Sequence, residues 1–370
     1  MKEYTVLTIN PGSTGTKTGV VRGGRVILDV NVDSLPGEFD GCATFADQAP
    51  LREKKIFEAL ENAGISLSEI DAVSGRGVGV RSCVGGTYEI NDQAYHDALN
   101  DIEGIHHPAI LGIVMAYRIG KQLGKPAYFV NPMNTDELCD EARMTGIRNL
   151  YRPARSHPLN QKQVCINHSK RQGKRYEGCN YVIAHMGGGT SISAHCHGRM
   201  VDSTRIGDGQ GPLSPNRAGD ICAADVFTMV KRGFSLEQIK KLVSGTGGFV
   251  DLCGTDDVRK VVRDLIPARD KRAKPAYDTM EYTMVKWIAM MAGALRGKVD
   301  AVLLTGGLAN DKELVARLTE DCSWIAPVYV YPGSYETEAL GAGVERVLTD
   351  EEEARTYTGM PAWDGFGFED

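Results

Sequence analysis

The chain has 370 residues and a formal net charge of −6, with 42% hydrophobic and 24% charged residues. This length exceeds what one hydrophobic core usually organises, so it predicts two domains of roughly 150–200 residues each. A net acidic chain without concentrated Lys and Arg argues against nucleic acid or acidic membrane surfaces as partners.

The first predicted elements flank a Gly/Ser/Thr loop. Residues 6–30 read VLTINPGSTGTKTGVVRGGRVILDV, which parses as a strand, a loop, a strand, a Gly-Gly-Arg turn and a third strand, hence two consecutive hairpins. Glycines let a backbone approach a phosphate closely, while amide and hydroxyl groups donate hydrogen bonds to its oxygens. Taken alone, such a loop is more typical of an ordinary hairpin turn than of a phosphate site.

Helix-like and strand-like segments then alternate along the chain, which indicates α/β domains. Helical spacing occurs at Lys54 to Ala63, Ile110 to Leu123, Asn160 to Arg171, Met280 to Leu295 and Glu336 to Leu348. Apolar strand candidates are Ala127 to Val130, Ala301 to Leu304 and Val328 to Tyr331.

The opening pattern returns at residues 181–203, YVIAHMGGGTSISAHCHGRMVDS, with Asn10 corresponding to His185. Such a duplication favours a functional reading, because two facing copies would place phosphate-binding turns on opposite walls of a cleft between domains. We therefore expect an N-terminal domain over residues 1–175 and a C-terminal domain over residues 176–349.

The last segment, residues 350–370, is acidic and ends with Trp363, Phe366 and Phe368. We expect a surface-packed or frayed tail and assign it no function. Nine cysteines without a Cys-x-x-Cys pair predict reduced thiols. No signal peptide opens the chain, and no apolar run is long enough to cross a bilayer, so we expect a cytoplasmic protein.

Several further motifs follow one another in a fixed order. They are NPGSTGTK at 10–17, RSHPLNQK at 155–162, AHMGGGTS at 184–191, GDGQGPLSPNRAG at 207–219, GTDDVR at 254–259 and LLTGGLAND at 303–311. Together they resemble the butyrate kinases, within the superfamily of acetate and sugar kinases, heat-shock ATPases and actin. The resemblance covers nearly all of residues 4–349. It implies a duplicated actin-like (ribonuclease H-like) α/β fold of two domains with a nucleotide cleft between them.

The resemblance also implies roles for two arginines and a histidine. Arg76, in SGRGVGV, matches the substrate-side arginine of the acetate kinase relatives, and Arg217, in SPNRAG, matches their transition-state arginine. A guanidinium can hold a carboxylate or a phosphate through two parallel hydrogen bonds. His107 resembles the substrate-pocket histidine. Without the family, the arginines are typical of exposed ion pairs and His107 of a helix entry or core position.

On the cofactor side, the resemblance implies ATP/ADP and Mg²⁺. Asn10 and Glu338 match metal-side positions, where Mg²⁺ generally keeps several waters. Glu336 is a rival for Glu338, and either can simply stabilise a helix start. The remaining cofactor-binding candidates are Gly12, Ser13, Thr14, Thr16, Lys17, His185, Gly187, Gly188, Gly189, Asp257, Val258, Arg259, Gly306, Gly307, Leu308, Ala309 and Asn310.

Two positions depart from the acetate kinase pattern. Asn131 stands where an Asp is usual, which removes a possible base and one magnesium-side charge. Gln161 replaces a charge-stabilising His, although LNQ at this place is itself typical of butyrate kinases. His157 and Asn160 remain polar candidates for catalysis, and Asn160 is also a plausible helix N-cap.

The expected activity is reversible transfer of the γ-phosphate of Mg-ATP to butyrate or a similar short-chain carboxylate. A carboxylate is already ionised at neutral pH, so attack needs no strong general base and Asn131 is chemically tolerable. Alternatives are an acetate, propionate or branched-chain acid kinase, a nucleotide-binding module that lost its chemistry with the carboxylate, and an actin-like polymer. Relatives imply a homodimer or higher homo-oligomer.

Overall fold

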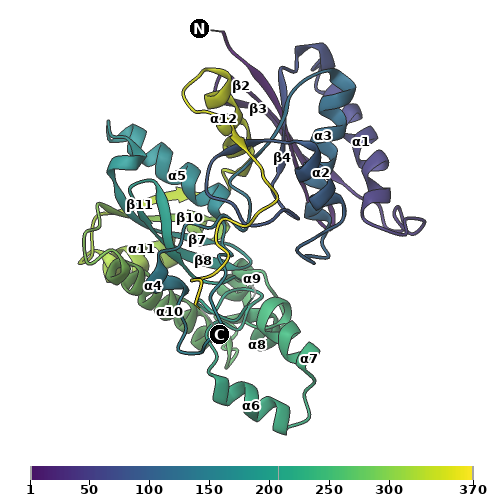
Figure 1. Ribbon diagram of the computed structural model, residues 1–370. Coiled ribbons are helices and arrows are strands. Elements are labelled where there is room, and N and C mark those ends of the chain that lie inside the picture. Colours follow the sequence, from purple (N-terminus) through teal and green to yellow (C-terminus); the bar gives the residue numbers. More distant parts are fainter. Residues whose placement is uncertain (1, 207, 369–370) are drawn as a thin grey trace. The chain divides into compact units, whose positions relative to one another are not determined.

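The computed structural model describes residues 2–206 and 208–368, which form two compact units (Figure 1). One unit contains residues 2–136 and 335–368, and the other residues 137–334. This division differs from the expected boundary near residue 175, because residues 335–349 and the tail return to the first unit. Gly207, which opens one of the motifs, and the last two tail residues lie outside the described part. No helix in that part is long and apolar enough to cross a membrane.

The first unit is built on a seven-stranded sheet in the order β12-β5-β6-β4-β1-β2-β3. β1 pairs antiparallel with β2 and parallel with β4, so the N-terminal hairpin is continuous with the parallel part of the sheet. The strands are β1 (Thr5–Pro11), β2 (Gly15–Arg22), β3 (Arg25–Asp33), β4 (Ala72–Arg76), β5 (Thr87–Glu89), β6 (Ala127–Val130) and β12 (Arg355–Thr356).

The second unit is built on a five-stranded sheet in the order β11-β10-β7-β8-β9. β7 is antiparallel to β8 and parallel to β10, which repeats the relations of β1. The strands are β7 (Asn180–Met186), β8 (Thr190–Cys196), β9 (Arg199–Ser203), β10 (Ala301–Gly306) and β11 (Val328–Pro332).

The predicted duplication of two consecutive hairpins is confirmed. Asn10 and His185 are equivalent, because each is the penultimate residue of the first strand of its copy, with Asn10 opposite Lys17 and His185 opposite Ser191. Both copies also have a register shift between their second and third strands, at Val20/Val21 and at Ala194/His195. Such a bulge bends and twists a strand locally.

All five expected helices are present. Three agree within two residues at each end, whereas the helices expected over 54–63 and 280–295 begin five and seven residues earlier, at Ala49 and Ala273. The helices of the first unit are α1 (Ala49–Asn62), α2 (Asp92–Leu99), α3 (Leu111–Leu123) and α12 (Glu336–Leu348). The helices of the second unit are α4 (Asp140–Arg143), α5 (Pro158–Arg171), α6 (Ala223–Lys231), α7 (Leu236–Lys241), α8 (Phe249–Cys253), α9 (Val258–Lys260), α10 (Ala273–Ala294) and α11 (Lys312–Cys322).

Helices cover both faces of the first sheet. Phe129 of β6 belongs to the core shared with α1 and α3, while its neighbour Val130 faces α12, as strand alternation requires. A Cβ atom on Gly341 would lie 2.4 Å from Val21, and one on Gly343 would lie 2.7 Å from Val130. These glycines therefore let α12 approach the sheet closely, and its first residue, Glu336, lies beside the end of β1.

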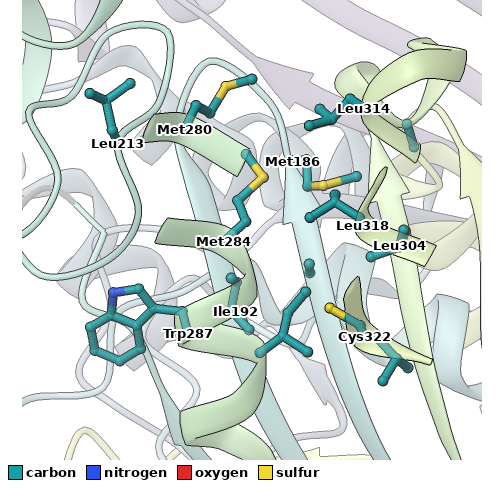
Figure 2. Close-up of a cluster of buried hydrophobic side chains, with 14 of the residues drawn as sticks. Met186, Ile192, Leu213, Met280, Met284, Trp287, Leu304, Leu314, Leu318 and Cys322 are labelled. Atoms are coloured by element: carbon teal, nitrogen blue, oxygen red, sulfur yellow. The ribbon is translucent and has the colours of Figure 1, made fainter. Parts of the chain in front are cut away.

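The second sheet has a hydrophobic core on one face and polar packing on the other. Figure 2 shows Met280, Met284 and Trp287 of α10 packed against Ile192 and Met186 of the sheet. The intervening residues of β8, Ser191, Ser193 and His195, point to the opposite face, toward α5.

Candidate functional site

The first Gly/Ser/Thr loop is a tight turn that presents two hydroxyl side chains. The Gly12 amide donates to the Gly15 carbonyl oxygen at 2.7 Å, which closes the turn between β1 and β2. Ser13 and Thr14 are exposed at its tip, whereas Thr16 is buried at the start of β2. The loop thus offers hydroxyl and amide donors to a ligand.

Ser13 is hydrogen-bonded to His107. Ser13 Oγ lies 3.0 Å from His107 Nε2, and the Ala109 amide donates to His107 Nδ1 at 3.1 Å. Because Nδ1 accepts, the neutral ring carries its proton on Nε2 and donates to Ser13. Burial, and the charges of Arg76 and Arg52, lower the pKa of His107, which favours this neutral form. His107 therefore cannot accept the proton of Ser13, and the Ser13 hydroxyl remains able to donate to a ligand.

Asn10, Arg76 and Glu336 meet at the end of the first sheet. Asn10 Nδ2 donates to Glu336 Oε2 at 2.8 Å, and Arg76 Nη1 lies 2.5 Å from Glu336 Oε1. Glu336 and the half-buried Glu338 both lie in the first turn of α12, where a carboxylate interacts favourably with the helix dipole. Glu336, one of the two rival glutamates, thus contacts both Asn10 and Arg76.

Lys17, near the start of β2, forms an ion pair. Its Nζ lies 3.1 Å from Asp29 of β3, and Thr337 of α12 donates to the same carboxylate at 2.8 Å. A contact between Lys17 and a phosphate would therefore compete with this surface ion pair.

Asn131 follows β6 in a left-handed conformation, with φ of 40°. Asn is one of the few residue types that adopt this conformation readily. Its Oδ1 accepts from the Gly86 amide at 2.9 Å, and its own amide donates to the Gly86 carbonyl at 3.0 Å. Asn131 thus joins the end of β6 to the segment before β5.

In the second unit, two histidines stack beside the glycine loop. The rings of His157 and His185 lie 4.3 Å apart with an interplanar angle of 29°. His157 Nδ1 is 2.8 Å from Ser191 Oγ at the start of β8. The loop Gly187–Gly189 connects these strands, and its Gly188 carbonyl accepts from the Asn216 amide at 3.1 Å.

Gln161 and Asn160 are buried on the inner face of α5. Gln161 Nε2 donates to Ser191 Oγ at 3.0 Å, and its Oε1 accepts from Ser193 at 3.0 Å. Asn160 Nδ2 donates to Thr305 Oγ1 at 3.4 Å. It is not the N-cap of α5, because it lies inside the helix and His157 occupies the N-cap position. Gln161 therefore orients Ser191, which in turn contacts His157.

Arg217 lies against the glycine loop. A Cβ atom on Gly189 would lie 2.7 Å from the Arg217 Cζ and Nε atoms, so only glycine permits this approach. The Nε and Nη1 atoms are buried and have no hydrogen-bond partner among the described residues. Burial lowers the pKa of Arg217 and the charge of Asp208 partly opposes this, and an arginine guanidinium stays protonated inside proteins.

The predicted adenosine residues fall into two turns of the second unit. Asp257 receives both side-chain and backbone hydrogen bonds from Arg259, and Val258 is buried in the core. A Cβ atom on Gly306, where φ is 93°, would lie 2.3 Å from the Met186 carbonyl oxygen. This brings the short helix Gly307–Asn310, which includes Leu308 and Ala309, to the end of β7 beside the glycine loop. Asn310 Nδ2 donates to the Gly307 carbonyl at 3.0 Å.

Ser191 and Asn216 belong to this cluster but were not predicted. Ser191 contacts His157 and Gln161, and Asn216 fastens the glycine loop. The duplication carried a signal for Ser191, because it is opposite His185 as Lys17 is opposite Asn10.

The donor set suits a magnesium ion held mainly through water. Asn10 and Glu336 are adjacent, but Glu336 is already shared with Arg76. Among the residues that the structure describes, no group of three or more His, Cys, Asp or Glu side chains could hold a metal ion. Mg²⁺ bound to a nucleotide takes few protein ligands and keeps several waters, which fits such a sparse site.

Comparison with protein families and curated proteins gives a consistent result. Residues 145–325 match the acetokinase family model. The chain is 40% identical over 355 residues to a protein named "Probable butyrate kinase" from Clostridium botulinum (strain Alaska E43 / Type E3), covering 96% of this chain and 99% of that protein. The protein of the same name from the strain Eklund 17B / Type B has the same identity and coverage.

Solved structures share the fold. The acetate kinase of Porphyromonas gingivalis superposes with a TM-score of 0.78 at 19% identity, covering 93% of this chain and 100% of that one. A propionate kinase from Francisella tularensis gives 0.73 at 17% identity, covering 92% and 98%. The acetate kinase of Entamoeba histolytica gives 0.71 at 16% identity, covering 92% and 99%. At these identities the likeness shows the fold alone, and it confirms the expected α/β fold class.

Proposed function

Because the chain belongs to the acetokinase family, we propose that it is an ATP-dependent kinase acting on short-chain carboxylates. Its reaction is reversible transfer of the γ-phosphate of ATP to butyrate or an acid of similar length. The names of its 40% identical relatives support butyrate as the acceptor. The acetate and propionate kinases of known structure, at 16–19% identity, support the fold alone.

The observation that carries this proposal is the pair of buried guanidinium nitrogens of Arg217 that lack hydrogen-bond partners among the described residues. The side chain lies on a loop where a Cβ atom would collide with it. A buried, unpaired donor is costly unless a ligand completes its hydrogen bonds. A phosphoryl group entering the loop would supply the missing acceptors, and its developing charge would be stabilised there.

The first unit supplies groups for binding anions. Arg76 can hold the acceptor carboxylate, and Ser13, oriented by the proton on His107 Nε2, can donate to an anionic oxygen. The amides of the Gly12–Gly15 turn add further donors. In the second unit, the Gly187–Gly189 loop and the Gly307–Asn310 turn would receive the nucleotide.

The chemical step needs positioning rather than proton transfer. A carboxylate oxygen attacks the γ-phosphorus, and the bond between that phosphorus and the β,γ-bridging oxygen breaks. The electron pair of this bond leaves with ADP, so the products are an acyl phosphate and ADP. No proton changes place, because the acid is already ionised, and this is compatible with Asn131. Mg²⁺, when bound with ATP, would neutralise phosphate charge. Asn10 and either Glu336 or Glu338 would hold it through its water ligands.

The test is acyl phosphate formation by the purified protein. Mg-ATP is incubated with acetate, propionate, butyrate, valerate or isobutyrate, and the product is trapped with hydroxylamine as a hydroxamate. We expect product with butyrate and weaker turnover with the shorter and longer acids, because one methylene contributes only about 1–3 kcal/mol to discrimination. ATP binding without hydroxamate from any acid would refute the kinase assignment and favour a nucleotide-binding module.

A further inference from the structure

A buried arginine lies behind the first glycine loop. Arg52, in the first turns of α1, has only 2% of its surface exposed. Its Nη1 donates to the Gly15 carbonyl at 3.1 Å and to Thr16 Oγ1 at 2.9 Å. Its Nε and Nη2 donate to Gln48 Oε1 at 3.2 and 3.0 Å, and the guanidinium lies 4.7 Å from the centre of the Phe39 ring.

All hydrogen-bond partners of this guanidinium are neutral. No carboxylate of the described residues forms an ion pair with Arg52, whereas Arg22, Arg76 and Arg118 of the same unit each pair with a glutamate. The acidic group that acts on Arg52 from a distance is Glu38, and Lys55 already holds it at 2.6 Å. The positive charge of Arg52 is therefore buried without a counter-charge in contact.

Two features of this position make the buried charge of Arg52 unfavourable for the free energy of folding. Burial of an ion without a paired charge is strongly unfavourable, and a cation near a helix N-terminus also opposes the helix dipole. A neutral side chain would avoid both penalties if the role were only to fasten the loop. The retained charge points to an anion on the other side of the Gly12–Gly15 turn.

We propose that Arg52 is a positioning residue of the anion site, which fixes Gly15 and Thr16 and keeps a positive charge behind the loop that raises its affinity for a phosphate or carboxylate. The inference rests on the proposed function for the identity of the anion. The influence of this charge already extends to the loop, since Arg52 is one of the groups that lower the pKa of His107, the partner of Ser13.

The variant Gln48→Glu separates charge from hydrogen bonding. It leaves Arg52 in place and preserves an acceptor oxygen for both of its hydrogen bonds, but it supplies the missing counter-charge. We expect thermal stability to be unchanged or raised, while the affinities for inorganic phosphate and for ATP, measured by calorimetry, fall by about tenfold. If Arg52 only braced the fold, the affinities for phosphate and ATP would stay unchanged or rise, because the brace becomes stronger.

Two further variants complete the experiment. Gln238→Glu is the matched control, because Gln238 is an exposed residue of the second unit whose side-chain oxygen also accepts a hydrogen bond. It should bind phosphate and ATP as the natural protein does. Arg52→Gln, which removes the charge, should weaken binding as Gln48→Glu does. If this variant does not fold, Gln48→Glu decides alone.

The outcomes distinguish this inference from the proposed function. Unchanged phosphate and ATP affinity in Gln48→Glu overturns the role of Arg52, even if the natural protein makes acyl phosphate. A natural protein that binds neither phosphate nor ATP overturns it as well. A natural protein that binds phosphate, weakly so in Gln48→Glu, but forms no hydroxamate leaves Arg52 supported and the kinase assignment refuted.

Discussion

Arg217 is the residue on which the proposed chemistry depends most. Its guanidinium serves the transferring phosphate, so Arg217→Ala should lower turnover by about 10²-fold or more. Affinity for ATP should change much less, because the loop amides remain. Turnover is measured by hydroxamate formation and ATP binding by calorimetry. Arg175→Ala is the control, since Arg175 is 88% exposed and paired with Glu177. Unchanged turnover in Arg217→Ala would remove this residue from the site.

Asn131 is the clearest departure from the acetate kinase pattern. We expect the natural protein to be active and Asn131→Asp to preserve acyl phosphate formation. An aspartate also tolerates the left-handed conformation, and its oxygen can accept from Gly86 in the same way. The added carboxylate should chiefly shift the dependence on Mg²⁺, which is measured from steady-state rates at several Mg²⁺ concentrations. An inactive natural protein that this replacement rescues would contradict the proposed mechanism.

His195 of β8 should make the free energy of unfolding depend on pH in the acidic range. It is fully buried, and its Nδ1 lies 2.6 Å from Tyr176 Oη. Burial, and then the charge of Lys162, hold the pKa of His195 well below its ordinary value. The unfolded chain therefore binds a proton below about pH 6.5 that the native protein excludes. The free energy of unfolding should fall with decreasing pH in this range by up to about 1.4 kcal/mol per pH unit.

The variant His195→Gln tests this dependence. It should be less stable at pH 7.5, yet lose less stability between pH 6.5 and 5, as measured by urea unfolding at each pH. His197→Gln is the control, because His197 is exposed in the adjacent turn. An equally steep pH dependence in His195→Gln would show that this histidine does not carry the effect.

At the scale of elements, the C-terminal tail is a packed part of the first unit. β12 pairs with β5, Glu352 accepts from the Thr87 amide at 3.0 Å, and the Ala362 amide donates to Ser82 at 2.8 Å. Tyr357 is buried, donates to Asp97 at 2.6 Å and accepts from the Arg81 amide at 2.9 Å. The tail thus holds the segment that runs from Arg76 to β5. A surface-packed end was one of the two expected states of the tail.

Loss of this anchor should affect the Arg76 side of the site. Tyr357→Phe removes the hydroxyl that donates to the buried Asp97 carboxylate and accepts from the partly buried Arg81 amide, so it should cost about 1–3 kcal/mol of stability. The KM for the carboxylate should rise more than the KM for ATP, because the loosened segment follows Arg76. Thermal unfolding and kinetics with each substrate check this. Tyr282→Phe is the control, since Tyr282 is 62% exposed. A change confined to the KM for ATP would contradict this role of the tail.

Sequence patterns predicted the duplicated hairpins and the long helices because both rest on local information: glycine-rich turns, alternation and helical spacing. They did not predict Arg52, since a charged residue in PLREKK of α1 is normally solvated. Nor did they predict which sheet the helix 336–348 covers. That depends on Gly341 and Gly343 meeting Val21 and Val130, which are distant in sequence. The expected boundary near residue 175 did not include the return of the chain after residue 334 to the first unit, because that return also depends on contacts between residues distant in sequence.

At the scale of the whole molecule, one unit is formed by a single chain segment and the other by two. Residues 137–334 form one uninterrupted segment, whereas the first unit needs both 2–136 and 335–368. We expect residues 137–334, expressed alone, to unfold cooperatively, because their core of α10, α11, β7, β8 and β10 is complete.

The N-terminal fragment 1–136 should behave differently. Without α12, the sheet face that carries Val21 and Val130 would be exposed to water, and apolar surface of that kind favours aggregation. Joining 1–136 to 335–370 through a flexible Gly/Ser linker should restore a soluble, cooperatively unfolding protein. Circular dichroism during heating, with size-exclusion chromatography, measures both properties. A soluble and cooperative fragment 1–136, or a linked fragment that remains aggregated, would contradict the assignment of α12 to the first unit.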